Sequence, residues 1–563
     1  MSEPLGSQPI KKQSFLQGTA ILALGTILVK LMGFLFKTPL NNIIGSTGFG
    51  YFNSAYDVYN VLLMISTTGL PVAMSRMISE AQALGNEAQI RRIFKTAIYV
   101  FLAIGIVGSL VMLVFCRPLS VLVSNSENSW AAIAALAPCV LLICMISAYR
   151  GFFQGQSNMT PTSVSQVFES ITRLVVGLAL AWLIMKLTGE RCVRENGLVL
   201  APGESALQYG DMTLAAGGAI LGVTLGCLVS VLYLHGKFRR ASAALTASAA
   251  GTPKTGKATM KELLSIAVPI TLGSAGLQII NLFDTMIYMR RLEDGLGWSV
   301  AQAESLKGVY NYQQTIFALP CAFIPTITIA CIPAITAALT RKDHEGVRAT
   351  EESALRTMAL ISMPCAAGLF CMAEPVIRLL CRYSADELAV AVPMLSILGI
   401  AVIFNSLVLL LNAFMQAHGD VTSPVINMLI GGVVKVIVNY ILVAIPSLNI
   451  IGAAIGTIVC YVTITVLDLI AMRRSVTTRP AIFRNVLRPA AAAGIMGAAT
   501  FFAAALLRNL TDSNTVVCLG ALIAAVVVYV IFVIVLRCIT YEDCMLLPKG
   551  EKIAKILHIK QKT

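Results

Sequence analysis

Basic residues stand at matched depths in two apolar stretches of this 563-residue chain. The segment 152–176, FFQGQSNMTPTSVSQVFESITRLVV, recurs 262 residues later as 414–438, FMQAHGDVTSPVINMLIGGVVKVIV. In this register Arg173 meets Lys435, and each lies 13 residues beyond a threonine that follows a polar turn. At ~1.5 Å per helical residue, both cations lie roughly 20 Å into an apolar core that is about 30 Å thick. A cation at that depth is costly, so the pair predicts a functional site in a protein interior.

The first apolar stretch places two more bases on one helical face. Thr26, Lys30, Gly33 and Lys37 follow one another at helical spacing. We expect Lys30 to line a polar cavity, because it lies well inside the stretch. Lys37, near the opposite end, either lines the same cavity or extends to the membrane interface.

The second apolar stretch carries a largely polar stripe. It includes Asn53 and Asp57 and continues at helical spacing through Asn60 and Thr67. A stripe of this kind on a spanning helix should face water or protein rather than lipid. Asp57 therefore either helps to bind a polar substrate or neutralises a lysine of the first stretch.

Two further bases have an acid four residues away on the same helix. Arg76 precedes Glu80, and it either contacts substrate or forms an interfacial ion pair. Glu169 precedes Arg173, so part of that charge is expected to be structural. Lys435 has no acid at this spacing, which makes it the strongest single candidate for substrate binding.

Possible ion-coupling residues are Asp284 and Asn281 in one stretch and Asn427 in the second copy of the repeat. Asp284 either binds a coupling cation or proton, or offsets the bases of the cavity. A further acid, Asp468, is expected to pair with Arg473 or Arg474. We expect no cofactor and no metal, with the membrane potential, Na+ or H+ as energy source.

The composition indicates the elements that carry these residues. Hydrophobic residues form 57% of the chain and charged residues only 12%, about half the charged share of a soluble domain. Fourteen apolar runs of roughly 20 residues are present. The sequence thus predicts an all-α polytopic membrane protein with about fourteen transmembrane helices.

The distribution of Lys and Arg predicts the orientation. With the N-terminus in the cytoplasm, the cytoplasmic segments hold 27 basic residues and the opposite side holds 11. The positive-inside rule therefore places both termini in the cytoplasm. A bacterial cytoplasmic membrane, with anionic lipids as partners, fits the net charge of +14.

The repeat offset pairs stretches six spans apart, which indicates two parallel six-helix bundles. We predict an N-terminal bundle at 11–236, a basic cytoplasmic linker at 237–261 and a C-terminal bundle at 262–472. Two extra helices occupy 485–536, and the tail, 537–563, reads as a basic amphipathic cytoplasmic segment.

Other function classes are disfavoured. The basic residues are scattered over many short loops, unlike a nucleic-acid-binding face. The four histidines show no metal-ligand spacing, no phosphate-binding glycine loop occurs and no loop is long enough for a catalytic domain. We therefore expect a transporter rather than an enzyme.

The run GTAILALGTILVKLMGFLFKTPLNNIIGSTGFGYFNSAYDVYNVLLMISTTGLPVAMSRMISEAQALGN resembles the start of stage V sporulation protein B-type proteins. These are related to MurJ-type lipid II flippases, in the superfamily that also holds multidrug and toxin extruders. The plan of six plus six plus two helices agrees over the whole chain. Lys30, in V-K-L-M-G, stands where relatives often carry Arg in an S-R-x-L-G-like pattern.

This resemblance implies export of a polyprenyl-diphosphate-linked saccharide, such as a peptidoglycan precursor, by alternating access. Basic residues would bind the diphosphate while the polyprenyl tail stays in lipid, and the extra helices would help to form a groove for the tail. Cell-wall synthesis enzymes are possible partners. Three alternatives stay open: a cation-coupled multidrug exporter, a membrane-embedded glycosyltransferase or ligase, and a non-transporting scaffold for wall synthesis. The sequence leaves open which saccharide is moved, and whether it serves wall growth, spore cortex or capsule.

Overall fold

The structure is a computed structural model that describes residues 15–196, 205–247, 251–476, 478 and 480–538. All regular structure in these residues is helical, as predicted, and no strand occurs among them. The predicted amphipathic tail, 537–563, lies outside the described residues except for its first two positions.

The chain divides into two compact units, Met1–Gly308 and Val309–Thr563. Each unit is described by itself below. The bundle boundaries expected from the repeat, 11–236 and 262–472, remain predictions.

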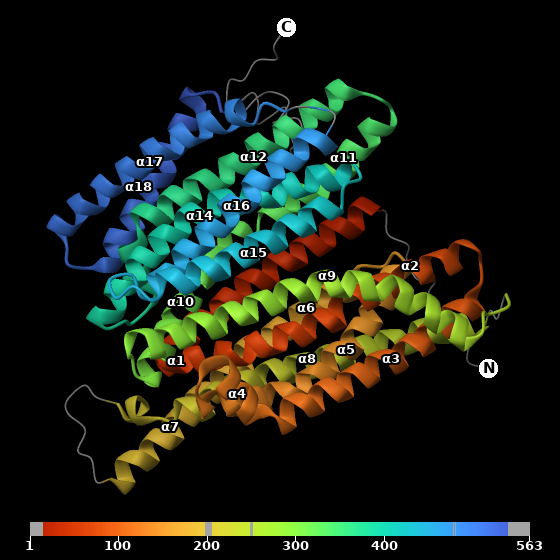
Figure 1. Cartoon of the computed structure of the whole chain (residues 1–563), viewed down its shortest axis with the longest axis horizontal. Coiled ribbons are helices and arrows are strands. Elements are labelled where there is room, and N and C mark those ends of the chain that lie inside the picture. The colour runs from red at the N-terminus through yellow and green to blue at the C-terminus, as the bar shows by residue number, and fades with distance from the viewer. Residues whose placement is uncertain (1–14, 197–204, 248–250, 477, 479, 539–563) are drawn as a thin grey trace, which may run out of the picture. The chain divides into compact units, whose positions relative to one another are not determined.

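The first unit is built around three long helices, with α5 packing against both α3 and α8 (Figure 1). Its α-helices are α1 (Phe15–Met64), α2 (Leu70–Ala83), α3 (Glu87–Val114), α4 (Cys116–Ser124), α5 (Trp130–Gly155), α6 (Thr160–Thr172), α7 (Leu178–Glu195), α8 (Met212–Ala247), α9 (Gly256–Arg290) and the first turns of α10 (Val300–Cys321). The two apolar stretches predicted at the start of the chain are joined in α1, which is broken only at Gly45. Gly45 has a φ of 70°, a value that favours glycine.

In the second unit α12 packs against α14 and α17, and α15 packs against α16. Its remaining α-helices are α11 (Ile324–Thr340), α12 (His344–Cys371), α13 (Ala373–Leu380), α14 (Ala385–Ala417), α15 (Thr422–Leu442), α16 (Ile451–Ser475), α17 (Ile482–Leu510) and α18 (Asn514–Val535). The proline-rich stretch 309–337 is not one helix, because α10 ends at Cys321 and α11 begins at Ile324.

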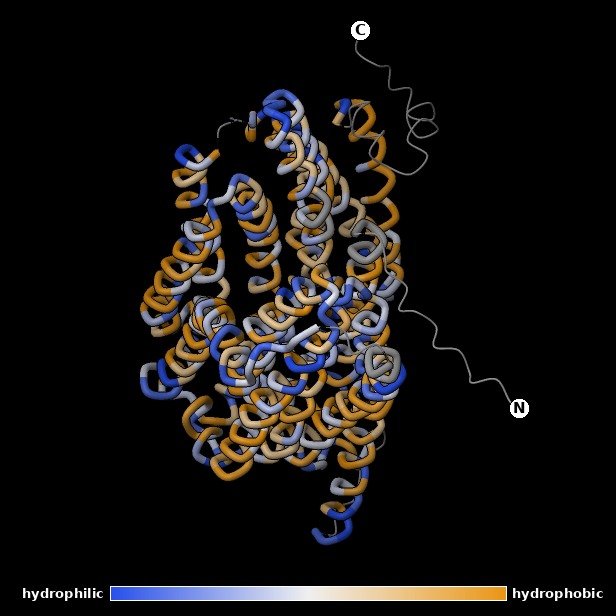
Figure 2. The backbone as a smooth tube through the Cα atoms, turned by 90° about the vertical axis from the view of Figure 1, so that its right-hand side faces the viewer, coloured by the Kyte–Doolittle hydropathy of each residue, from blue (hydrophilic) through white to orange (hydrophobic). Residues whose placement is uncertain are grey.

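Eleven helices in the described part of the chain are long and apolar enough to cross a membrane. The first of these, Leu24–Met64, covers two of the fourteen predicted stretches, so the two counts agree approximately. Figure 2 shows hydrophobic residues along the helices and hydrophilic residues at many of their ends. Large apolar side chains such as Phe502 and Leu272 remain exposed, as a lipid-facing surface requires.

The predicted basic linker, 237–261, is helical at both ends in the described residues. Helix α8 continues to Ala247, and α9 begins at Gly256 after the N-cap Thr255. Between them, Asn86 Nδ2 donates to the Thr252 carbonyl at 3.0 Å, and Lys254 N donates to Gln89 Oε1 at 2.7 Å. An Ala-rich extension of α8 and these hydrogen bonds to the start of α3 stabilise the described parts of the segment.

The internal repeat is visible in the two polar turns. Ser157 and Gly419, which match in the repeat register, both have positive φ, 56° and 93°. Their amides donate to Gln154 and Gln416 carbonyls at 3.0 Å in both copies. The next residues, Asn158 and Asp420, donate to the carbonyls of the residues five positions earlier. The two copies therefore fold into the same turn.

Candidate functional site

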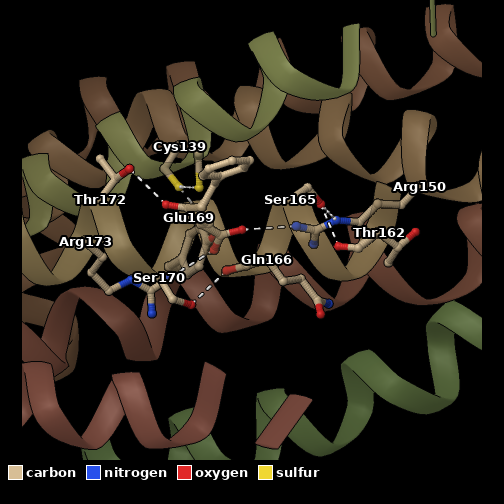
Figure 3. Close-up of polar contacts among 12 residues, drawn as sticks. Cys139, Arg150, Thr162, Ser165, Gln166, Glu169, Ser170, Thr172 and Arg173 are labelled. Atoms are coloured by element: carbon tan, nitrogen blue, oxygen red, sulfur yellow. Dashed lines mark hydrogen bonds and ion pairs between the residues drawn. The ribbon is translucent and has the colours of Figure 1, made fainter. Parts of the chain in front are cut away.

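A carboxylate shared by two guanidinium groups forms the centre of the candidate site in the first unit (Figure 3). Glu169 Oε1 lies 3.0 Å from Arg173 Nη2, and Glu169 Oε2 lies 3.2 Å from Arg150 Nη2. Arg150 Nε also donates to Ser165 Oγ at 3.1 Å. The predicted pair of Glu169 with Arg173 is thus present, but two bases share one acid. The buried Nε of Arg173 has no hydrogen-bond partner among the described residues.

Close backbone packing positions Arg173. It begins a π-helical turn, Arg173–Gly177, between α6 and α7, and such turns are frequent at functional sites. A Cβ added at Gly222 of α8 would lie 2.3 Å from Gly177 Cα. A Cβ at Gly177 would lie 2.9 Å from the ring of Phe36, which precedes Lys37 on α1. Gly177 and Gly222 therefore allow the turn that begins at Arg173 to pack closely against both α8 and α1.

Lys37 of α1 lies within electrostatic reach of Arg173, Lys30 and Asp57. Lys30 is exposed and Lys37 is half-buried. The sequence-predicted bases Lys30 and Arg173 thus both lie within electrostatic reach of Lys37, and Arg150 is linked to Arg173 through Glu169. Like charges this close repel one another, so the group favours an anionic ligand.

Asp57 has a partner that sequence reasoning missed. Its Oδ2 lies 3.2 Å from Nζ of Lys307, whose side chain is fully buried. The Lys307 ammonium also donates to Ser54 Oγ at 2.7 Å. Asp57 is therefore engaged by a direct ion pair as well as by the field of Lys37, and it neutralises Lys307 more directly than the lysines of the first stretch.

The other predicted residues of the first unit lie apart from this arrangement. Asn53 is buried and donates to the Phe49 carbonyl of its own helix at 2.7 Å. Arg76 is exposed, as is Glu80, and the two form no ion pair with each other. On α9, Asp284 is buried, whereas Asn281 is exposed.

In the second unit Lys435 lies on α15, half-buried and within electrostatic reach of Tyr461 on α16. One turn further on, Asn439 is fully buried. A Cβ at Gly456 of α16 would lie 1.9 Å from Asn439 Oδ1, so α15 and α16 approach closely beside Lys435. The predicted base is thus held by a tightly packed helix pair.

The acid of α16 has a different partner from the one expected. Asn427 Nδ2 donates to Asp468 Oδ1 at 2.9 Å, and both side chains are buried. The predicted ion pair of Asp468 with Arg473 or Arg474 is absent from the described residues, so that prediction was wrong. Asp468 points inward to α15, whereas Arg473 and Arg474 are exposed at the end of the helix.

Among the described residues, no group of three or more His, Cys, Asp or Glu side chains could hold a metal ion. The candidate site can therefore interact with a ligand through ion pairs, hydrogen bonds and the electrostatic field of its basic side chains. Arg150 and Lys307 are the functional candidates that sequence reasoning missed. Both lie at the edges of apolar stretches, where the sequence does not distinguish a base inside the protein from a base in a solvent-exposed loop.

Comparison with solved structures shows which known fold the chain shares. The chain is similar to a structure of "Lipid II flippase MurJ, inward closed conformation", with a TM-score of 0.66, 14% identity and coverage of 93% of this chain and 99% of that one. It is also similar to an inward-facing multidrug resistance MATE family transporter of the MOP superfamily, with a TM-score of 0.62, 15% identity and coverage of 80% and 94%. Both likenesses are of fold, and they agree with the eleven apolar helices that are long enough to cross a membrane.

The family follows from the sequence. Residues 15–338 match the model of the family described as "Polysaccharide biosynthesis protein", and residues 307–441 match the MatE model. Because the first match spans more than half of the 563 residues, the chain belongs to the polysaccharide biosynthesis protein family. The family resemblance predicted from the start of the chain is confirmed.

Two relatives from Bacillus subtilis (strain 168) match over most of their length. "Stage V sporulation protein B" is 26% identical over 458 residues, which cover 81% of this chain and 83% of the relative. "Lipid II flippase MurJ" is 25% identical over 475 residues, which cover 82% of each.

Proposed function

We propose that this protein moves a polyprenyl-diphosphate-linked saccharide, such as a lipid II-like unit, across a bacterial cytoplasmic membrane by alternating access. The observation that carries the proposal is the excess of positive charge in the first unit. Lys30, Lys37, Arg150 and Arg173 gather there, and Glu169 is shared by two of them.

A diphosphate suits this charge. Guanidinium groups bind phosphate oxygens in a bidentate manner, and charge-assisted hydrogen bonds are roughly twice as strong as neutral ones. The Nε of Arg173, which has no hydrogen-bond partner among the described residues, can donate to such an oxygen, and the half-buried Lys37 adds positive charge beside it. Lys435 supplies a further base in the second unit. The printed name of one relative, a lipid II flippase, supports the same substrate class.

The direct test measures flipping of a lipid II-like substrate in proteoliposomes. Lys30→Ala, Lys37→Ala, Arg173→Ala and Lys435→Ala are each expected to slow flipping about 10- to 100-fold, the equivalent of one charge-assisted hydrogen bond of about 1.5–3 kcal/mol. Arg191→Ala is the matched control, because Arg191 is exposed on α7 and pairs with Glu195. Normal flipping by all four folded variants would exclude the basic site.

A second candidate is export of cationic drugs. The MatE match over residues 307–441 and the similarity to a multidrug transporter favour it. The charge of the first unit opposes it, because a cationic substrate would be repelled by the gathered bases. Export of a cationic dye by the wild type, without flipping of the saccharide lipid, would support this candidate.

A non-transporting scaffold would not need Lys30, Lys37, Arg173 and Lys435 within its apolar helices. Lys435→Glu separates this reading from transport, since charge reversal should abolish flipping but leave the assembly of wall-synthesis enzymes intact.

For energy coupling, we propose the membrane potential, Na+ or H+, with Asp284, Asn281 and Asn427 as candidate residues. Dissipating each gradient in turn during the flipping assay tests this.

A further inference from the structure

Two short segments of the first unit approach each other unusually closely. We call residues 46–50 of α1 and 304–308 of α10 the α1–α10 seam. A Cβ at Gly308 would lie 1.8 Å from the Ser46 carbonyl oxygen, and one at Gly50 would lie 2.4 Å from the Glu304 carbonyl oxygen. Ser46 Oγ and Ser305 Oγ are hydrogen-bonded at 2.8 Å. Only glycine permits such contact, so the seam is closed in this structure.

A fully buried carboxyl group lies at this seam. Glu304 has a relative exposure of 0%, and neither of its carboxyl oxygens accepts a hydrogen bond among the described residues. The Ser124 hydroxyl is near, but its single proton is directed to Ser54 Oγ or to the Ser120 carbonyl, each 3.3 Å away. Lys307, one turn further along α10, is engaged by Asp57 and Ser54.

The remaining charged and titratable neighbours do not supply a counter-charge. Glu293, in the turn after α9, is an acid and accepts a hydrogen bond from Asn125. Tyr51 of α1 accepts a hydrogen bond from Asn128 Nδ2 at 3.1 Å. With Asp57 and Lys307 forming an ion pair, an ionised Glu304 would leave the buried group with one net negative charge.

We propose that Glu304 is a proton-binding site that locks the α1–α10 seam. Burying an ionised carboxylate without a hydrogen-bond donor is costly, whereas the protonated acid leaves the buried group neutral. The closed seam therefore takes up a proton on the Glu304 carboxyl. Opening of the seam admits water, which stabilises the carboxylate and releases the proton.

Closure of the seam is linked to the pH because Glu304 binds its proton with different affinity in the closed and open states. The closed state holds the proton more tightly than the open state, so closure is complete at low pH and is lost as the pH rises. A single proton limits the change in the closing equilibrium to about tenfold per pH unit. This inference concerns a ligand, the proton, that the proposed substrate site does not involve, and it stands or falls independently of the substrate.

Hydrogen exchange of the full-length protein in lipid nanodiscs tests the proposal without a transport assay. The amides of residues 46–54 and 304–308 report on the seam, after correction for the pH dependence of intrinsic exchange. In the wild type, protection of these amides is expected to fall at least tenfold between about pH 5 and about pH 8. Glu304→Gln, which keeps the shape but carries no charge, should stay protected at both values.

Glu293→Gln is the matched control, because it removes a neighbouring carboxylate that has its own hydrogen-bond partner. It should retain the pH dependence of the wild type. Equal protection of the wild type at both pH values would overturn the proposal. So would a Glu304→Gln variant that opens with pH as the wild type does. If that variant does not fold, the pH series of the wild type alone still decides.

Discussion

At the scale of single residues, the first unit holds more positive charge than its acids balance. Glu169 keeps Arg150 and Arg173 together, yet one carboxylate cannot satisfy two guanidinium groups. The side chains are partly buried, with relative exposures of 14% to 23%. Their mutual repulsion is therefore incompletely screened by water, and an anion that enters the site gains the energy of relieving it.

Glu169→Gln tests how the two arginines are balanced. Without the shared carboxylate they repel each other, and we expect the free energy of unfolding to fall by about 1–2 kcal/mol for these partly exposed pairs. The double variant Glu169→Gln with Arg150→Gln should recover most of the loss, because one of the two repelling charges is gone. Unfolding by heat in detergent, followed by circular dichroism, measures both.

The control for this pair is Glu190→Gln, since Glu190 and Lys186 form an exposed ion pair 3.9 Å apart on α7. Its effect should stay below about 0.5 kcal/mol. Equal losses for the single and double variants would show that Glu169 acts through hydrogen bonds to its helix rather than through charge.

The sequence predicted part of this site, and the range of each contact explains which part. Glu169 and Arg173 lie one turn apart on a helix, so their pairing follows from spacing alone. Lys307 and Asp57 are 250 residues apart, and no helical period relates them. The partner of Asp468 was predicted wrongly for the same reason. The expected arginines are close to it in sequence, whereas Asn427, its hydrogen-bond partner, is close to it only in space.

At the scale of elements, glycine pairs set the distance between helices and thereby the position of the charges. The long helices themselves were predictable, because each needs an apolar run of about 20 residues. Their close approaches were not, since a glycine in an apolar run gives no sign of the helix that it faces. Gly177 and Gly222 illustrate this, as their contact holds the Arg173 turn against α8.

Gly222→Ala should therefore reduce flipping although it changes no charged group. The new Cβ would lie 2.3 Å from Gly177 Cα, so α8 and the Arg173 turn must separate. We expect a loss of flipping of about tenfold or more, in line with the sensitivity of binding sites to small displacements. The proteoliposome assay described above measures it.

Gly236→Ala is the matched control on the same helix, because a Cβ there meets nothing within 4 Å. Alanine in place of glycine in an open helical position should leave flipping unchanged and slightly stabilise the helix, by up to about 1 kcal/mol. Equal activity of both variants would show that the close approach at Gly222 does not position the site.

At the scale of the whole molecule, the charge pattern and the spans describe one topology. The excess of Lys and Arg, 42 against 28 Asp and Glu, falls mainly on the loops predicted to be cytoplasmic. Synthesis in a bacterial membrane retains such loops on the inner side. The helix ends of the structure supply exposed sites on both predicted sides, including Lys342 between α11 and α12 and Asp512 between α17 and α18.

We predict that Lys342 faces the cytoplasm and Asp512 faces the outside. A short epitope is inserted into the full-length chain at one position or the other, and the two insertions should differ in their accessibility to antibody. The epitope at Asp512 should be detected on intact spheroplasts, and the epitope at Lys342 only after the membrane is permeabilised. The side on which each site lies depends on the number of membrane spans between the two sites. One additional or one missing span between Lys342 and Asp512 would place both on the same side. Detection of both epitopes on intact spheroplasts would therefore contradict the odd number of spans, five, that lies between the two sites in the predicted topology.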